Sequence, residues 1–249
     1  MTADGLQVGI LLPAFAAGML VLATHVPLGR EVLRRGIVFI DLAIAQFAGL
    51  GIVVAHVFDA VHESWQVQAA AFAAALLGAL VLHWRERRYP AQQEAVIGVS
   101  FVVAACMAML LLANDPDAGE HLRELLVGQI LWTTWRDLAP LAVVTVAVLA
   151  AWHGTSLGRS RLGFYIAFAV AVTLSVQIVG VYLVFASLIV PALAAGDRLR
   201  LGYGVGIAGY AGGLLISAWL DLPSGAAIVL ALALAALTVA AARARRGTD

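Results

Sequence analysis

The chain has 249 residues, of which 63% are hydrophobic and only 12% are charged, whereas a soluble domain carries about 25% charged residues. This composition is that of a protein built to face lipid and not of an ordinary soluble domain. All 15 basic residues are arginines, and the absence of lysine excludes a phosphate-binding P-loop, which requires one. The chain therefore has no such loop with which to hydrolyse ATP by itself.

Apolar stretches of membrane-spanning length follow one another along the whole chain. A helix needs about 20 apolar residues to cross a hydrocarbon core about 30 Å thick. The stretch 162–195 is too long for one ordinary span and barely enough for two, and Gly180 at its middle is expected to break it. We predict an all-α polytopic membrane protein with eight to nine passes and a broken or doubled segment at 162–195. The predicted spans of this single transmembrane domain over 1–249 are about 6–27, 37–57, 66–83, 94–113, 138–152, 162–179, 181–195, 201–219 and 223–241.

The arginines give the expected orientation of these spans. Most of them lie in the segments 28–36, 84–92, 153–161, 196–200 and 242–249. The positive-inside rule puts these segments in the cytoplasm, with the N-terminus outside and the C-terminus in the cytoplasm.

Two further segments carry structural predictions. Residues 125–136 are too short to span, and we expect an interfacial helix with Trp132 and Trp135 at headgroup depth. The second segment carries two small-xxx-small pairs, a pattern typical of close helix packing. This packing joins either two subunits or helices of one chain, and the sequence leaves both open. The four glycines are Gly202, Gly206, Gly209 and Gly213.

Asp41 is the one charged residue well inside an otherwise uncharged apolar stretch, at the start of the second predicted span. Insertion scales put a carboxylate within the bilayer at roughly 2.5–3.5 kcal/mol unfavourable, so such a group is a functional candidate. The structural interpretation is an aspartate that is protonated or hydrogen-bonded to a neighbouring helix, and the functional one is a ligand or gate in a cation path. Gln46 and Gln177 are further candidates, because lipid offers a buried amide no partner.

The histidines are possible metal ligands, because neutral imidazole binds zinc well. His121 lies near Glu120 and Glu124 in an outer loop, which either attracts divalent cations or is only a solvated rim. His25 and His56 are expected at the ends of the first and second spans. No H-E-x-x-H, G-x-S-x-G or paired-cysteine signature is present, so we expect no enzyme.

Several segments, in chain order, resemble the permease subunit of ATP-binding-cassette (ABC) importers for zinc, manganese and related metals. Each segment is weak evidence alone, but the ordered set runs from about residue 10 to residue 240. The segments are 27–36, which leads into the span of Asp41, the E-x-x-I-G motif at 94–98, 125–131, which is similar to the family's L-L-F-G-x-I-L, 177–184 followed by 188–192, and 220–226.

The resemblance implies a homodimer of this subunit in the inner (cytoplasmic) membrane of a bacterium, with no nucleic-acid partner. It implies two cytoplasmic ABC ATPase subunits that bind ATP, an extracytoplasmic metal-binding protein, and alternating access. The chain would hold no cofactor and would pass a divalent metal, zinc first because of the histidines, then manganese or iron. The region from Pro191 to Arg200, with Asp197 and Arg198, would be the surface that couples to the ATPase.

One departure concerns the metal-binding pair of the family. Its members usually carry G-D-x-x-S-H in the second span, with Asp and His one helical turn apart. Here Gln46 takes the His position and Asp41 the Gly position, about 140° apart on a regular helix, so they cannot both face one ion. Either Asp41 meets Gln177 or the Asp41 of a second subunit, or the pore passes metal without strong binding.

Three alternatives remain open. A stand-alone cation- or proton-coupled secondary transporter would predict two repeated halves, and we find no convincing repeat. An ABC permease of this architecture with a non-metal substrate is the second. A non-transporting scaffold is the third, and it would tolerate replacement of Asp41 by leucine or asparagine.

Overall fold

The structure is a computed structural model that describes residues 3–57, 64–112, 128–154, 160–196 and 198–246. These residues fold into α-helices and two 3₁₀ turns, with no strand among them, which confirms the predicted all-α polytopic class. The elements are α1 (Ala3–Arg35), α2 (Ile40–Val57), α3 (Ser64–Arg88), η1 (Pro90–Gln92), α4 (Gln93–Leu111), η2 (Ile130–Trp132), α6 (Trp135–Gly154), α7 (Arg161–Val179), α8 (Val181–Ala195), α9 (Leu199–Leu220) and α10 (Ser224–Arg246).

The predicted break in 162–195 is confirmed at Gly180. Eight helices of the described residues are long and apolar enough to cross a membrane, and α8 is the shorter apolar helix. At about 1.5 Å per residue, its 15 residues extend about 22 Å, less than the hydrocarbon thickness. Gly180 separates α7 from α8 with φ of 81°, a backbone conformation that residues other than glycine rarely adopt. The chain therefore turns within the bundle.

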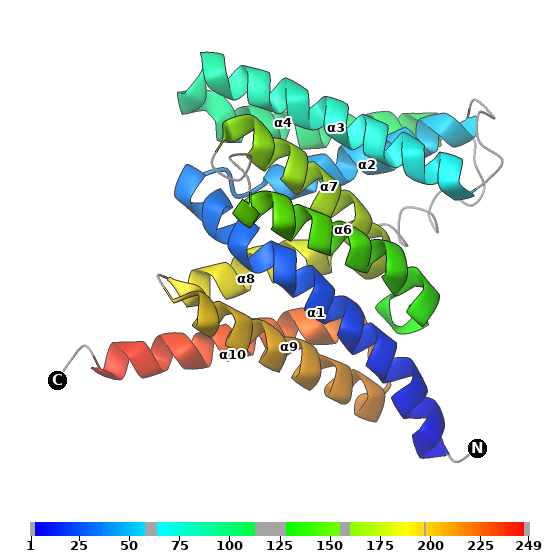
Figure 1. The fold of residues 1–249 in the computed structure, drawn as a ribbon, viewed down its shortest axis with the longest axis vertical. Helices are drawn as coiled ribbons and strands as arrows, with labels where there is room; N and C mark the ends of the chain where they lie inside the picture. The colour runs from blue at the N-terminus through cyan, green and yellow to red at the C-terminus, as the bar shows by residue number, and fades with distance from the viewer. Residues whose placement is uncertain (1–2, 58–63, 113–127, 155–159, 197, 247–249) are drawn as a thin grey trace.

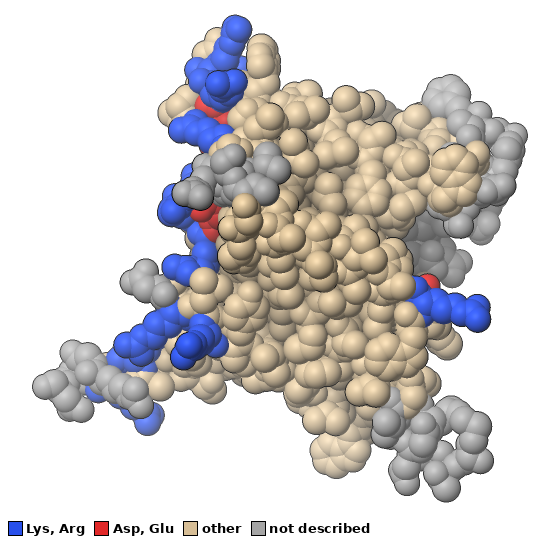
Figure 2. Space-filling view, in the orientation of Figure 1, with Lys and Arg blue, Asp and Glu red and all other residues tan. Residues whose placement is uncertain are grey.

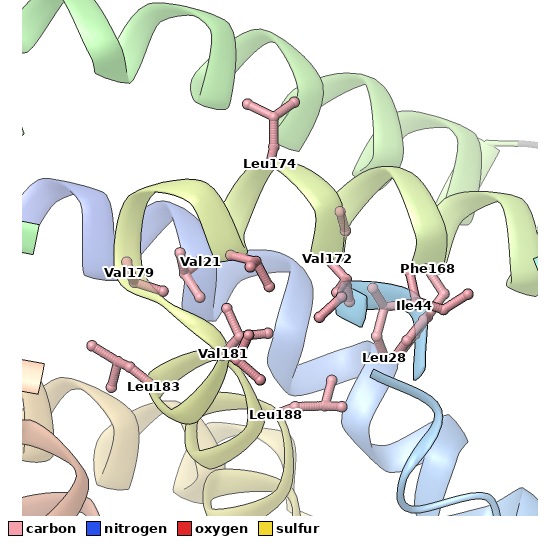
Figure 3. Packing of buried hydrophobic residues seen from close by; sticks show 14 of the residues in the cluster. Val21, Leu28, Ile44, Phe168, Val172, Leu174, Val179, Val181, Leu183 and Leu188 are labelled. Carbon is pink, nitrogen blue, oxygen red and sulfur yellow. The ribbon is translucent and has the colours of Figure 1, made fainter. Parts of the chain in front are cut away.

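The core of the molecule is built around α1, α7 and α8. Helix α1 packs against α8 and α9, α7 packs against α3, and α2 packs against α3 and α4. In Figure 1, α2, α3 and α4 lie at one end of the bundle and α9 and α10 at the other. Figure 3 shows Val21 and Leu28 of α1 among side chains of α7 and α8 around the break. These buried apolar contacts hold the break in place.

The glycines of α9 pack inside one chain. A Cβ at Gly206 would overlap Leu22 of α1, and one at Gly213 would overlap the backbone of Ile228 in α10. Gly202 lies against the Pro191 carbonyl, and Gly209 lies against Leu232. Of the two interpretations of this stripe, the structure therefore supports close packing within the monomer.

Arginines gather along one edge of the molecule, on the left in Figure 2. They come from the C-terminal ends of α1, α3 and α10, the start of α7 and the link between α8 and α9. We call this the arginine edge. It brings together segments that are distant in the chain, as expected if alternate helices run in opposite directions.

One local expectation is wrong. Within the described part of 125–136, the structure has only the 3₁₀ turn η2 and the first residues of α6 in place of an interfacial helix. Gly128 has φ of 66° and lies against the backbone of Val179 and Gly180, and Ile130 is fully buried. The segment enters the bundle beside the break because a glycine allows this close approach.

Candidate functional site

The chain enters α2 through a glycine turn that ends α1. Gly36 has φ of 67°, and its N–H donates to the Leu33 carbonyl at 3.2 Å. The Ile37 N–H donates to the Val32 carbonyl at 3.3 Å. This pair of bonds is the Schellman ending of a helix. The turn lets α2 begin at Ile40, so the next residue, Asp41, falls in its first turn.

Asp41 is a buried carboxylate without a hydrogen-bond partner. The residue is 1% exposed, and neither carboxylate oxygen has a hydrogen-bond partner among the described residues. Its place in the first turn of α2 puts it at the positive end of the helix dipole, which favours a negative charge. A buried carboxylate without a cation or donors is costly, so this position suits a group that binds a proton or a cation.

A second carboxylate, Glu94, reaches the same helix end from α4. Its Oε1 accepts a hydrogen bond from the Phe39 N–H at 3.3 Å, and its Oε2 is buried without a partner among the described residues. Phe39 lies two residues before Asp41, so Glu94 and Asp41 both lie at the start of α2. Two acids from different helices therefore meet at the start of α2. Three of their carboxylate oxygens have no hydrogen-bond partner among the described residues. We call Asp41 and Glu94 the acid pair.

Gln93 fixes the position of Glu94. Its side chain is buried, and its Nε2 donates to the Leu82 carbonyl and to the Tyr165 hydroxyl, both at 3.0 Å. The first turn of α4 is therefore tied to α3 and α7. Because Glu94 follows directly in this turn, the same contacts direct it toward the start of α2.

The two predicted glutamines do not join Asp41 in one chain. Asp41 has no hydrogen bond to either, because both of its oxygens lack partners among the described residues. Gln46 is half-buried on another face of the regular helix α2, and Gln177 is exposed in the last turns of α7. The exposed amide of Gln177 is therefore accessible from outside the chain.

The sequence predicts that His25 lies at the end of the first span. In the structure it lies deep in the bundle instead. Helix α1 continues to Arg35, ten residues or about 15 Å beyond His25. The ring is fully buried. Its Nδ1 lies 2.9 Å from the Val21 carbonyl and 3.0 Å from the Thr24 hydroxyl. Its Nε2 has no partner among the described residues.

The part of the chain that the structure describes contains no group of three or more His, Cys, Asp or Glu side chains placed to hold a metal ion. His121 lies outside the described residues. His56 is exposed at the end of α2. One chain thus offers the acid pair, and any fuller set of ligands needs groups from elsewhere.

The predicted coupling region lies on the arginine edge. Helix α8 ends at Ala195 and α9 begins at Leu199. In the link between them, the Arg198 N–H donates to the Ala195 carbonyl at 2.9 Å. Pro191 is buried in α8, and Arg198 is exposed. Asp197 lies outside the described residues.

Sequence reasoning did not single out Glu94 as a site residue, and it placed His25 at the end of a span. Glu94 was noted within the E-x-x-I-G motif, and an acid in the first turn of an apolar helix was the available signal. No sequence signal indicated that His25 lies deep in the bundle, because the arginines that follow it concealed the true length of α1.

Among the described residues, eight long apolar helices, the shorter apolar helix α8 after the break at Gly180, and the arginine edge define a multi-pass membrane protein. The ABC 3 transport family model matches residues 7–157 and 147–243, and the chain belongs to this family. This confirms the family predicted from the motifs.

Known proteins similar to the chain cover nearly all of it. An uncharacterized membrane protein of Synechocystis sp. is 26% identical over 260 residues, covering 94% of this chain and 91% of that protein. PsaBC from Streptococcus pneumoniae, solved in complex with a Fab, has a TM-score of 0.71 at 20% identity, covering 95% of this chain and 93% of that one. An inward-facing conformation of a metal-chelate type ABC transporter has a TM-score of 0.57 at 12% identity, covering 98% and 82%. The two solved structures share the fold.

Proposed function

We propose that the chain is the permease subunit of an ATP-driven importer for divalent metal ions. It acts as a homodimer with two cytoplasmic ATPase subunits and an extracytoplasmic metal-binding protein. Membership of the ABC 3 transport family supports this, as does the likeness to a metal-chelate type ABC transporter. The lysine-free sequence agrees, because the ATP-binding P-loop must belong to another chain.

The acid pair is the observation on which this proposal rests. The acid pair has three buried carboxylate oxygens without partners among the described residues, at the N-terminal end of a membrane helix. These oxygens are negatively charged ligands for a cation, which lipid does not supply. Asp41 supplies two of these oxygens, and Glu94 supplies one while its other oxygen holds the start of α2. Both acids thus contribute negative charge to a cation that leaves water inside the bilayer.

The donor atoms bear on the choice of metal. Carboxylate oxygens suit manganese, whereas zinc binds well to imidazole and thiolate. The sequence placed zinc first because of its histidines, yet the described histidines do not gather around the acid pair. The acid pair therefore favours manganese, with iron and zinc as the ions to compare.

A second copy of the chain would complete the path. Asp41 is closed off inside one chain, so transport requires the helices around it to move, as in alternating access. Gln46 and the exposed Gln177 are the polar groups left to face a second subunit. The arginine edge is the cytoplasmic side in this proposal, following the positive-inside rule, and the membrane is the bacterial inner membrane.

The test is ATP hydrolysis by the reconstituted complex of permease, ATPase and metal-binding protein, with zinc, manganese or iron supplied in turn. We expect at least one metal to stimulate hydrolysis, manganese most strongly. Stimulation by none of them, with the complex assembled, contradicts a metal importer and leaves an ABC permease with another substrate. Failure of any ATPase to bind the permease contradicts the ABC mechanism itself.

A further inference from the structure

The C-terminal helix is tied to the end of α8 by one arginine. Arg243 of α10 donates from Nη2 to the Ala195 carbonyl at 3.1 Å, across 48 residues of sequence. The same carbonyl accepts the Arg198 N–H at 2.9 Å. The guanidinium also lies beside Gly196, which turns the chain out of α8 with φ of 51°.

This contact suits the end of a helix. The last carbonyls of a helix have no partner within it, and a cation there is favoured by the helix dipole. A charged donor also makes a stronger hydrogen bond than a neutral one. Arg243 thus adds a third element to the corner at which α8 turns into α9.

The anchored corner is the predicted coupling region. Helix α10 packs along both α8 and α9, so its end is held by the two helices that the corner joins. Arg198 and Arg200, at the start of α9, are exposed. A partner that contacts the corner from the arginine edge therefore meets a surface whose shape depends on Arg243.

We propose that Arg243 is a positioning residue for coupling, which holds the α8–α9 corner in the shape that the ATPase subunit recognises. This inference rests on the proposed function, because it requires an ATPase partner. Arg243 acts through the Ala195 carbonyl and not by binding ATP or the transported ion. Its loss removes the side-chain hydrogen bond that ties α10 to the end of α8, while the packing of α8, α9 and α10 remains.

The experiment titrates the purified ATPase subunit onto the detergent-solubilised permease and then measures metal transported per ATP hydrolysed in proteoliposomes. For Arg243→Ala we expect ATPase affinity to fall about threefold to tenfold, the value of one hydrogen bond, and transport per ATP to fall as well. Arg243→Lys should keep most of both, because an ammonium retains the charge and a donor. Arg88→Ala is the matched control, since it removes an arginine from the same edge, where its guanidinium stacks on Trp84.

The outcomes separate the inference from the proposed function. Wild-type affinity and wild-type transport per ATP in Arg243→Ala overturn the role of Arg243, as does an equal loss in Arg88→Ala. If Arg243→Ala folds poorly, Arg243→Lys decides, and a loss in it as large as the loss expected for alanine overturns the inference. If the unsubstituted permease binds no ATPase, the proposed function fails first.

Discussion

Two helix ends of this protein differ in whether their polar groups have hydrogen-bond partners. At the C-terminal end of α8, the Ala195 carbonyl accepts two hydrogen bonds, one from Arg198 and one from Arg243. At the N-terminal end of α2, Asp41 is buried and neither of its oxygens has a partner among the described residues. Glu94 beside it also keeps one oxygen without a partner.

Under the proposed function, this difference separates a structural helix end from one that binds a cation. A fully bonded carbonyl fixes a corner, because each added donor restricts how the backbone can turn. A buried carboxylate without donors destabilises the fold unless another species supplies the charge or proton. We therefore interpret the end of α8 as a fixed contact surface and the start of α2 as a place reserved for a cation.

The largest effect is expected when both acids lose their charge. In the double variant Asp41→Asn with Glu94→Gln, metal uptake into proteoliposomes should fall by about a hundredfold, at tenfold per 1.4 kcal/mol. The cation would then meet only neutral groups inside the bilayer. Asp137→Asn is the control, because Asp137 is exposed and bonded to Thr134 at the start of α6. Equal uptake in the double variant and the control would remove the functional meaning of the acid pair.

Two neighbouring glycines of α9 test the close packing of α9 against α10. Gly213→Ala should lower the free energy of unfolding by about 1–3 kcal/mol, because its Cβ would overlap the Ile228 backbone. Gly212→Ala places the same methyl in open space and should be neutral or stabilise slightly, since alanine is the better helix former. Thermal unfolding in detergent measures both. Equal melting temperatures would mean that α9 and α10 do not pack as described.

The smallest effect is expected for Glu94→Gln alone. The glutamine carbonyl still accepts the Phe39 N–H, so the start of α2 is kept and only the charge is lost. Uptake should fall about threefold to tenfold, a loss that corresponds to about 1 kcal/mol. The thermal stability should not change. Glu94→Ala also removes the cap and should lower stability by about 1 kcal/mol. A stability loss in Glu94→Gln as large as that in Glu94→Ala would make Glu94 purely structural.

The fold class was predictable because it depends on local composition. Apolar runs, arginine-rich segments and Gly180 each act within a few residues, so the all-α polytopic class and the break at 162–195 follow from the sequence. The family follows from ordered motifs. Asp41 was recognisable because a charge in an apolar run is conspicuous within a short window of sequence.

The contacts around the candidate site were not predictable, because they join distant residues. Glu94 reaches Phe39 across 55 residues, and Arg243 reaches Ala195 across 48. Neither pairing leaves a periodic or local pattern in one sequence. The contact of Asp41 with Gln177, one of the three arrangements that the sequence left open, is not formed within one chain, where Gln177 is exposed. The roles of all the predicted site residues stay predictions: Asp41, Gln46, Gln177, His121, Pro191, Asp197 and Arg198.

The most direct test of the account is metal uptake by Asp41→Asn, measured per assembled complex in proteoliposomes that contain the ATPase and the metal-binding protein. Asparagine keeps the size of the side chain and removes its charge, so the fold and ATPase binding should be retained. We predict that uptake falls about tenfold or more, the effect of one lost charged ligand. Unchanged uptake with the complex intact would contradict the account and make Asp41 a structural residue.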